Sequence, residues 1–511
     1  MYKAIIFFSN LIWLVSMLPR WFVFKLSVLF PEYMQQKRLK KIVSQSQQTN
    51  LQNFQRQAPK EYEDYKGDIK QIMSGNFTVL TKTAPVLLEP TGGSTSGTKL
   101  IPYTKALKKE FHHAIAPWLV ELFFKYPSLL TGQQYWSITP ASEINIDSEI
   151  PVGFESDTDY LSGLQKNINK NIFPVPGSLQ KCRHFDSVVF VTLLFLMNTP
   201  HLRFLSFWHP SLLIIIIDIL KKRFEELLNT LETGQLPGDI EIEVKIKSNA
   251  KRVKQIREHG CKPDSIWQNI KVISCWAGND KKYWIDRIRE IFPNAAIQPK
   301  GLIATEGITT IPLFKKQDVL AVCSHYYEFE TDEGKILPFR GLEKGKTYHL
   351  ILTTSGGFVR YKTHDLVKVI DYYHKVPCLE FISRNNYTSD ICGEKISLQQ
   401  AEKIRGSFPC IFSFAMIAPE KMANGFRYAV YIETNENINL EDFLESRLCE
   451  NFHYRHARNT GQLQKAVMHH VVNPIEKINS YTVVNKKQIG TLKHAALSLE
   501  MHWNTIFELN D

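Results

Sequence analysis

A loop that could bind phosphate lies at residues 91–98, where the sequence TGGSTSGT holds three glycines and five hydroxyl residues. Glycines let the backbone turn through conformations that are closed to other residues, and the hydroxyls of Ser94, Thr95 and Ser96 add side-chain donors to the exposed backbone amides. Together these groups can surround the negative charge of a phosphate chain. A glycine- and serine-rich loop can also be a flexible turn, so a binding role needs support from residues elsewhere in the chain.

The loop departs from the P-loop pattern G-x-x-x-x-G-K-[ST]. Thr98 separates Gly97 from Lys99, and Leu100 stands where a P-loop has the hydroxyl that binds magnesium. A P-loop also opens a helix, whereas this loop is followed by the extended run KLIPYT, and the helical spacing of apolar residues begins only after it. The sequence therefore predicts a loop that joins two strands.

The composition limits the class of protein. With 511 residues, 44% hydrophobic and 22% charged, the chain is long enough for two or more globular domains. The net charge of +11 favours anionic partners, but lysines and arginines are spread along the chain without a nucleic-acid-binding motif, so we expect no nucleic acid partner. Eight scattered cysteines without a C-x-x-C pair predict neither a zinc site nor a disulfide framework, which fits a reducing cytosol.

Residues 1–31 are the segment for which a membrane must be considered. The apolar run at residues 4–18 is too short to span a bilayer, and we expect Pro19 and Arg20 to interrupt it. Two interpretations remain open. The segment is either a helix buried against the protein body or an interfacial helix with its basic residues at lipid headgroups. We expect a cytoplasmic protein, with peripheral contact to the inner face of a membrane under the second interpretation.

The remaining pattern predicts an α/β protein in several parts. Helical spacing covers residues 103–130 and 186–235, and residues 270–307 alternate strand, helix and strand as in an α/β sheet. After residue 318 the sequence is rich in strands, with a hairpin turn at Gly356 and Gly357.

A change of pattern near Arg384 predicts a domain boundary, because shorter helices and strands follow it. We expect an apolar N-terminal helix at residues 1–31, a large domain with a β-barrel-like part at residues 32–383, and a small mobile α+β lid at residues 384–511.

Eight stretches follow one another in an order that resembles the Gretchen Hagen acyl acid amido synthetases: EPTGGSTSGTKLIPYT, EIPVGFESDTDYLS, KVISCWAGND, KGLIATEG, HYYEFE, FVRYKTHDLVKV, SRNNYTSDICGEK and QIGTLK. This family belongs to the adenylate-forming superfamily shared with acyl-CoA synthetases and luciferases, and the chain is similar to its bacterial members. The resemblance implies the adenylate-forming fold and the use of ATP and Mg²⁺. It also implies a ligase that adenylates a carboxylic acid and then transfers the acyl group to an amine, usually an amino acid.

The resemblance implies a nucleotide site made from residues far apart in the sequence. Ser94, Thr95 and Ser96 would bind the β- and γ-phosphates. Thr305 and Glu306 would lie at the phosphates, with Glu306 as the magnesium ligand.

Further residues would bind the rest of the nucleotide. Asp365 would accept hydrogen bonds from both ribose hydroxyls. Tyr326 or Tyr327 would stack on adenine, because Leu302 replaces the aromatic residue that the family usually has. His364 replaces the usual glycine before the aspartate.

Three basic residues are assigned roles by the same resemblance. Lys395 would offset the charge of the α-phosphate near the acyl carboxylate. Lys493 would enter the site in only one of the two half-reactions, carried by the small domain. Arg384 would mark the hinge.

Two other functions remain open. The same adenylate could deliver its acyl group to coenzyme A, or the chain could be a non-catalytic membrane-associated scaffold that keeps the fold. His112, His113 and His325 are candidates for a catalytic base only by their position in the sequence. The expected partners are a carboxylic acid and an amino acid or other amine, and we expect a monomer.

Overall fold

The computed structural model describes residues 2–91, 99–137, 147–153, 166–182, 184–242, 244–277, 282–313, 318–384, 388–392, 394–422, 425–459, 461–484 and 496–509. The chain divides into two compact units. The large unit comprises Met1–Thr363 and Lys368–Glu380, and the small unit comprises His364–Val367 and Phe381–Asp511.

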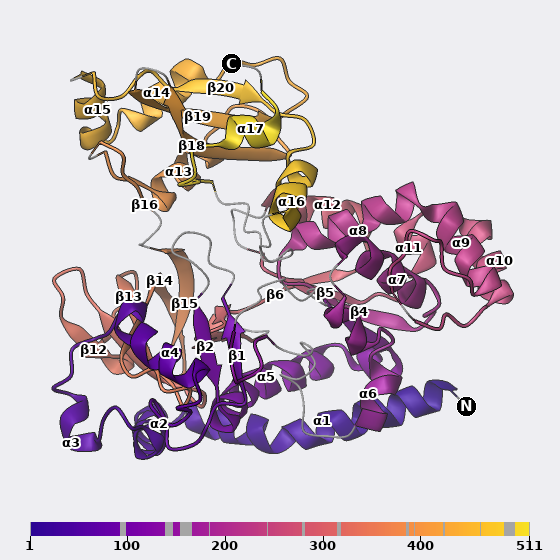
Figure 1. Cartoon of the computed structure of the whole chain (residues 1–511). Helices are drawn as coiled ribbons and strands as arrows, with labels where there is room; N and C mark the ends of the chain where they lie inside the picture. The colour runs from indigo at the N-terminus through magenta and orange to yellow at the C-terminus, as the bar shows by residue number, and fades with distance from the viewer. Residues whose placement is uncertain are drawn as a thin grey trace. The chain divides into compact units, whose positions relative to one another are not determined.

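The chain begins with a long helix, α1 (Tyr2–Ser27), which runs along α5 (Lys105–Lys125) (Figure 1). The expected interruption at Pro19 is wrong, because α1 continues through it. A proline inside a helix costs about 3 kcal/mol, and contacts on both sides of Pro19 offset this cost. Within the described residues, α1 is long and apolar enough to cross a membrane by length and composition, and 33% of its most apolar window is buried.

The predicted hairpin around the glycine-rich loop is confirmed. Strands β1 (Leu87–Pro90) and β2 (Leu100–Tyr103) pair antiparallel, and α5 follows directly. The backbone N–H of Thr91 donates to the carbonyl of Lys99 over 2.8 Å and closes the base of the loop. Residues 92–98, including the predicted phosphate contacts Ser94, Thr95 and Ser96, lie outside the described residues.

A four-stranded parallel sheet forms the α/β part of the large unit, in the order β3-β4-β5-β6. Its strands are β3 (Gln133–Trp136), β4 (Leu202–Ser206), β5 (Val272–Cys275) and β6 (Ala296–Pro299). The helices of this part are α6 (Lys166–Ile172), α7 (Phe185–Met197), α8 (Pro210–Lys222), α9 (Phe224–Thr233), α10 (Ala250–His259), α11 (Pro263–Ile266) and α12 (Lys282–Ile291).

The helical pattern predicted at residues 186–235 is confirmed by α7, α8 and α9, but it missed β4, which lies between α7 and α8. A short apolar run between two apolar helices cannot be told from helix by periodicity alone. The α/β alternation predicted further along the chain is confirmed by β5, α12 and β6.

The strand-rich part of the large unit is a seven-stranded sheet in the order β12-β11-β13-β14-β15-β10-β9. Its strands are β9 (Thr310–Pro312), β10 (Asp318–Leu320), β11 (Tyr326–Glu330), β12 (Ile336–Pro338), β13 (Thr347–Thr353), β14 (Tyr361–Tyr373) and β15 (Val376–Arg384). A two-stranded hairpin, β7 (Ile303–Ala304) and β8 (Gly307–Ile308), precedes it, and the short helices α2 (Pro31–Gln45), α3 (Leu51–Phe54) and α4 (Lys66–Met73) belong to the same unit. The predicted turn between β13 and β14 is present, with Gly357 at a φ of 105°.

The small unit is built around the sheet β18-β19-β20. One buried cluster joins this sheet to the helices α13, α14 and α15, and a second joins it to α16 and α17. The elements are β16 (Thr388–Ser389), β17 (Ile396–Ser397), α13 (Leu398–Gly406), β18 (Phe414–Met422), β19 (Gly425–Glu433), α14 (Glu441–Leu448), α15 (Phe452–Asn459), β20 (Val467–His470), α16 (Pro474–Val484) and α17 (Trp503–Phe507).

Candidate active site

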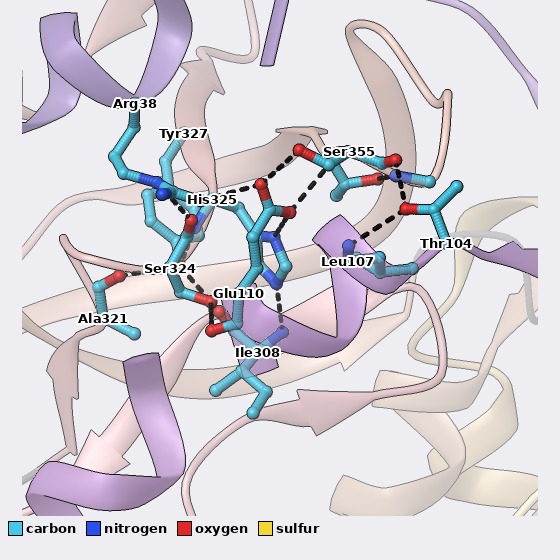
Figure 2. A network of polar contacts seen from close by, with 12 residues as sticks. Arg38, Thr104, Leu107, Glu110, Ile308, Ala321, Ser324, His325, Tyr327 and Ser355 are labelled. Carbon is cyan, nitrogen blue, oxygen red and sulfur yellow. Dashed lines mark hydrogen bonds and ion pairs between the residues drawn. The ribbon is translucent and has the colours of Figure 1, made fainter. Parts of the chain in front are cut away.

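A buried network of polar side chains is centred on Glu110 of α5, the helix that follows the glycine-rich hairpin (Figure 2). The Glu110 carboxylate is 2.7 Å from the guanidinium of Arg38, which α2 supplies. It also accepts hydrogen bonds from the hydroxyl and the backbone N–H of Ser355, over 2.6 and 3.0 Å, in the turn between β13 and β14. The Nδ1 atom of His325 is 2.9 Å from the same carboxylate. The network therefore joins segments that are more than 200 residues apart in the sequence.

The hydrogen bonds of His325 fix its tautomer. The backbone N–H of Ile308 donates to Nε2 over 3.0 Å, so Nε2 carries no proton and Nδ1 donates its own to Glu110. Both ring nitrogens are engaged and the side chain is fully buried. His325 therefore has a structural role, and it has no nitrogen available to take a proton from a substrate amine.

The charge state of Glu110 follows from its neighbours. Burial alone would raise the pKa of this carboxyl. The hydrogen bond from His325, the charge of Arg38 and the hydrogen bond from Ser355 outweigh burial and hold the pKa of Glu110 below its usual range. Glu110 is therefore ionised at neutral pH and neutralises Arg38 inside the protein.

The network positions the β7–β8 hairpin, whose turn carries Thr305 and Glu306. The hydrogen bond from Ile308 to His325 holds one arm of this hairpin. The hydroxyl of Tyr103, at the end of β2, donates to the carbonyl of Thr305 over 2.6 Å. The predicted phosphate-side turn therefore lies directly beside the strand that leaves the glycine-rich loop.

Glu306 is buried and within electrostatic range of the loop exit. Burial raises the pKa of Tyr62, and the charges of Glu63 and Glu306 raise it further. The Tyr62 hydroxyl accepts a hydrogen bond of 2.6 Å from the backbone N–H of Leu100, the first residue of β2. Glu306 therefore lies within electrostatic range of Tyr62, a residue that contacts the start of β2.

The turn between β13 and β14 contacts the other end of β2. The Thr104 hydroxyl donates to the carbonyl of Ser355 over 2.7 Å and also caps α5 through the N–H of Leu107. A Cβ atom on Gly356 would lie 2.7 Å from the carbonyl oxygen of Pro102, so only glycine allows this approach. Two turns therefore hold the C-terminal end of β2: the turn between β7 and β8 and the turn between β13 and β14.

Asp365, the predicted ribose contact, is buried in β14. His364, directly before it, has a φ of 64°, in the left-handed region that favours glycine. The chain therefore keeps a glycine-like backbone at the position where the family has glycine, although a histidine occupies it. Strain of this kind persists only where the surrounding structure enforces it.

We expect that His364→Gly raises the free energy of unfolding by about 0.5–1 kcal/mol. The left-handed backbone conformation is strained for histidine, which has a Cβ atom, and is not strained for glycine. Urea-induced unfolding measures the change. The control is Lys368→Gly in the same strand, where φ is not positive and glycine should lower stability. Equal destabilisation by both changes would contradict the assignment of strain to His364.

The two tyrosines proposed to stack on adenine differ in accessibility. Tyr327 is fully buried, and its hydroxyl donates to the carbonyl of Ile308 over 2.6 Å. Tyr326 is half-buried, with its ring packed edge-on against Phe54. Of the pair, only Tyr326 is partly exposed.

The side chain of Lys395, in the small unit, is exposed, whereas hydrogen bonds hold its backbone in place. Its φ is 48°, and its carbonyl, like that of Glu394, accepts from the amide of Asn451, over 3.4 and 3.1 Å respectively. The buried Glu394 carboxylate accepts from the backbone N–H of Cys392 over 2.7 Å and from the hydroxyl of Tyr428 over 2.6 Å. These anchors were missed from the sequence, because Tyr428 and Asn451 approach the loop only in the folded unit.

Two other predicted residues, Lys493 and Arg384, are described not at all or only in part. Lys493 lies outside the described residues. Arg384 ends β15, and only its backbone is described. Among the described residues, no group of three or more His, Cys, Asp or Glu side chains could hold a metal ion. A magnesium ion at Glu306 would therefore take most of its oxygen ligands from the nucleotide and water, which is how Mg²⁺ is usually held beside phosphates.

A second buried cluster, missed from the sequence, lies at the carboxyl ends of the parallel strands. Lys300 directly follows β6 and donates to the hydroxyl of Ser206, the last residue of β4, over 2.7 Å. The rings of Trp118, Trp136 and Trp208 lie 5.4, 5.4 and 4.9 Å from its ammonium group.

The same cluster contains polar atoms without a hydrogen-bond partner in the described part of the chain. They are Nε1 of Trp118 and Oγ of Ser274 on β5. The carboxyl ends of parallel strands are the usual ligand site of open α/β sheets. The sequence signal was the position of Lys300 directly after a buried strand.

Comparisons with known proteins give the same family over most of the chain. The GH3 family N-terminal domain matches residues 31–297, and the GH3 family central domain matches residues 319–384. The chain is 22% identical to the indole-3-acetic acid-amido synthetase GH3.3 of Arabidopsis thaliana over 410 residues, which cover 73% of this chain and 67% of the relative.

Two further comparisons extend this result. The 4-substituted benzoates-glutamate ligase GH3.12 of Arabidopsis thaliana is 22% identical over 209 residues, 36% of each chain. The solved structure of AtGH3.15 acyl acid amido synthetase in complex with 2,4-DB superposes with a TM-score of 0.81 at 16% identity and covers 97% of this chain and 96% of that one. This likeness confirms the expected fold. The match to the GH3 N-terminal domain spans more than half of the chain, and the match to the GH3 central domain adds most of the seven-stranded sheet. The chain therefore belongs to the GH3 family.

Proposed function

We propose that the protein is an ATP-dependent ligase that adenylates a carboxylic acid and transfers the acyl group to an amino acid. The observation that carries the proposal is the Thr305–Glu306 turn held against the strand that leaves the glycine-rich loop. The relatives support the reaction class, since their names describe indole-3-acetic acid-amido synthetases and a benzoate–glutamate ligase.

In the first half-reaction an oxygen of the acid attacks the α-phosphorus of ATP, and pyrophosphate leaves. The glycine-rich loop would hold the β- and γ-phosphates through Ser94, Thr95 and Ser96, and Asp365 would orient the ribose. Glu306 would hold Mg²⁺, which neutralises charge on the leaving pyrophosphate. The hydrogen bond from Tyr103 to Thr305 fixes the backbone beside Glu306, so the carboxylate need not be ordered at the moment of reaction.

In the second half-reaction an amine attacks the carbonyl carbon of the mixed anhydride, and AMP leaves. Lys395 would offset charge at the α-phosphate in the first step, and Lys493 would act in only one of the two steps. The buried Lys300 and its three tryptophans are well suited to contact the acyl group, since they offer apolar ring faces and one cation.

The test is adenylation measured without an acceptor. We expect ATP–pyrophosphate exchange and trapping of a hydroxamate by hydroxylamine with at least one member of a panel of aromatic and aliphatic acids. Mass analysis after adding either the amino acids or coenzyme A identifies the acceptor. Lys395→Ala should abolish the exchange while leaving the protein folded, because its side chain is exposed.

The result that would overturn the proposal is a folded protein that gives neither exchange nor hydroxamate with any acid, which would favour a non-catalytic scaffold. A thioester with coenzyme A and no amide would keep the adenylate but replace the acceptor.

A further inference from the structure

The N-terminal helix exposes an unusual amount of apolar surface. Seventeen large hydrophobic side chains are exposed in the described part of the chain, and eleven of them belong to residues 2–33. They are Tyr2, Ile5, Phe8, Ile12, Val15, Phe22, Val23, Leu26, Leu29, Phe30 and Tyr33. Scattered exposed apolar residues are normal, but a contiguous set of this kind marks an interaction surface.

The eight of these residues that belong to α1 form one face of the helix, which we call the apolar row. Its members Ile5, Phe8, Ile12 and Val15 follow one another at three- or four-residue spacing, and Phe22 and Leu26 continue the same spacing beyond Pro19. The opposite face of α1 is buried against the large unit. The apolar row therefore faces outward on a helix whose other face packs against the rest of the large unit.

The surface extends beyond α1. The ring of Trp21 packs edge-on at 5.4 Å against Phe124 of α5, whose side chain is 51% exposed. Leu29, Phe30 and Tyr33 carry the exposed apolar surface across the junction of α1 and α2.

The charges around the apolar row are mostly positive. The first 60 residues contain nine lysines and arginines and a single acidic residue, Glu32, which gives +8 of the net charge of +11 for the whole chain. Lys3, Lys37, Lys40 and Lys41 are exposed. An apolar stripe bordered by cations is complementary to an anionic lipid surface, where acyl chains accept the apolar side chains and headgroups accept the charges.

The buried face of α1 argues against a transmembrane orientation. Asn10 has no exposed surface, and its amide donates to the carbonyls of Leu130 and Gly132 over 3.0 and 2.8 Å. Glu121 of α5 is 2.6 Å from the ammonium of Lys25 and accepts from the indole N–H of Trp21 over 2.9 Å. A helix that crossed the bilayer would lose these partners and place Asn10 and Lys25 in hydrocarbon.

We propose that α1 and its junction with α2 dock the protein on the surface of an anionic lipid bilayer. Helix α1 lies in the plane of the membrane, the apolar row enters the boundary between headgroups and acyl chains, and the exposed lysines contact the anionic headgroups. This property is independent of the ligase site, so it holds or fails whether or not the proposed function is correct.

The experiment uses the full-length protein and large unilamellar vesicles, either of phosphatidylcholine alone or of phosphatidylcholine with phosphatidylglycerol. Co-sedimentation should show binding that is much stronger to the anionic vesicles. The triple variant Phe8→Gln, Phe22→Gln and Leu26→Gln should weaken it by about 100-fold, because three side chains lose their burial in lipid. The control Ile411→Gln, Val472→Gln and Met501→Gln changes exposed hydrophobics of the small unit and should bind as the wild type does.

A second pair of variants tests the charges. Lys37→Glu, Lys40→Glu and Lys41→Glu together should weaken binding to anionic vesicles by about 100-fold. The control Lys245→Glu, Lys251→Glu and Lys254→Glu changes the net charge equally at exposed lysines elsewhere and should have little effect.

Four outcomes would overturn the proposal. They are no binding by the wild type, equal loss in a control, resistance of the bound protein to an alkaline carbonate wash, which would indicate a spanning helix, and a dimer in sedimentation velocity that the apolar-row variant abolishes. The last result would assign the surface to a second copy of the chain. Circular dichroism of every variant checks that a loss of binding is not a loss of folding.

Discussion

Replacing Glu306 with glutamine is expected to lower the rate of acyl-adenylate formation by about 1,000-fold, since a carboxylate that holds Mg²⁺ at the leaving phosphates supplies several kcal/mol of charge stabilisation. Glutamine keeps the shape of the side chain and removes only its charge, so folding should change little. The measurement is ATP–pyrophosphate exchange over a range of Mg²⁺ concentrations. The variant should need more Mg²⁺ and should not reach the wild-type rate.

The matched control for this prediction is Glu63→Gln. Glu63, like Glu306, raises the pKa of Tyr62, but it is largely exposed and has Lys66 as its ion-pair partner, 3.0 Å away. We expect near wild-type exchange from it. If the Glu306 variant keeps its rate and its Mg²⁺ dependence, the carboxylate is not a metal ligand, and its burial then has only a structural meaning.

Replacing Glu110 with alanine is expected to lower the free energy of unfolding by about 3–5 kcal/mol, because it leaves the guanidinium of Arg38 buried without its counter-charge. Ser355 and His325 also lose their acceptor. Urea-induced unfolding of the full-length protein at pH 7 measures the loss. The double variant Arg38→Met with Glu110→Leu should recover much of it, since it removes both charges and keeps apolar volume.

The same prediction has a definite pH dependence. The pKa of Glu110 is held below its usual range in the folded protein, so its contribution to stability is present above the pKa of the unfolded chain and is lost as pH falls through the folded pKa. The stability difference between wild type and Glu110→Ala should therefore shrink in acid. A difference that grows on acidification would contradict the ionised assignment.

Local patterns predicted the elements that bring the site together. The glycine-rich loop between two strands and the helix after it follow from residues within one stretch of chain, as does the α/β alternation of β5, α12 and β6. Strand β4 was missed because a short buried strand lacks alternation. The path of α1 through Pro19 was missed because packing against α5, which no local pattern records, outweighs the cost of the proline.

The candidate site was only partly accessible from the sequence. The turn of Thr305 and Glu306 was found through the family resemblance, but its supports Tyr103 and His325 were not, since their hydrogen bonds join residues distant in the chain. The Lys300 cluster escaped for the same reason, because its three tryptophans come from different elements. Residue types predict which groups could react, whereas hydrogen bonds and packing between residues distant in the sequence decide what holds those groups in place.

The ion pair between Arg38 and Glu110 has a practical consequence for anyone who shortens the protein to aid crystallisation. Cutting the chain before Pro31 removes the whole of α1 but retains the arginine that neutralises the interior carboxylate. Cutting later, past α2, also leaves that carboxylate without its counter-charge in the core. Removal of α1 alone already uncovers the face of the large unit that Trp13, Leu14 and Phe24 cover, so a shortened protein keeps its charge balance only if it keeps α2.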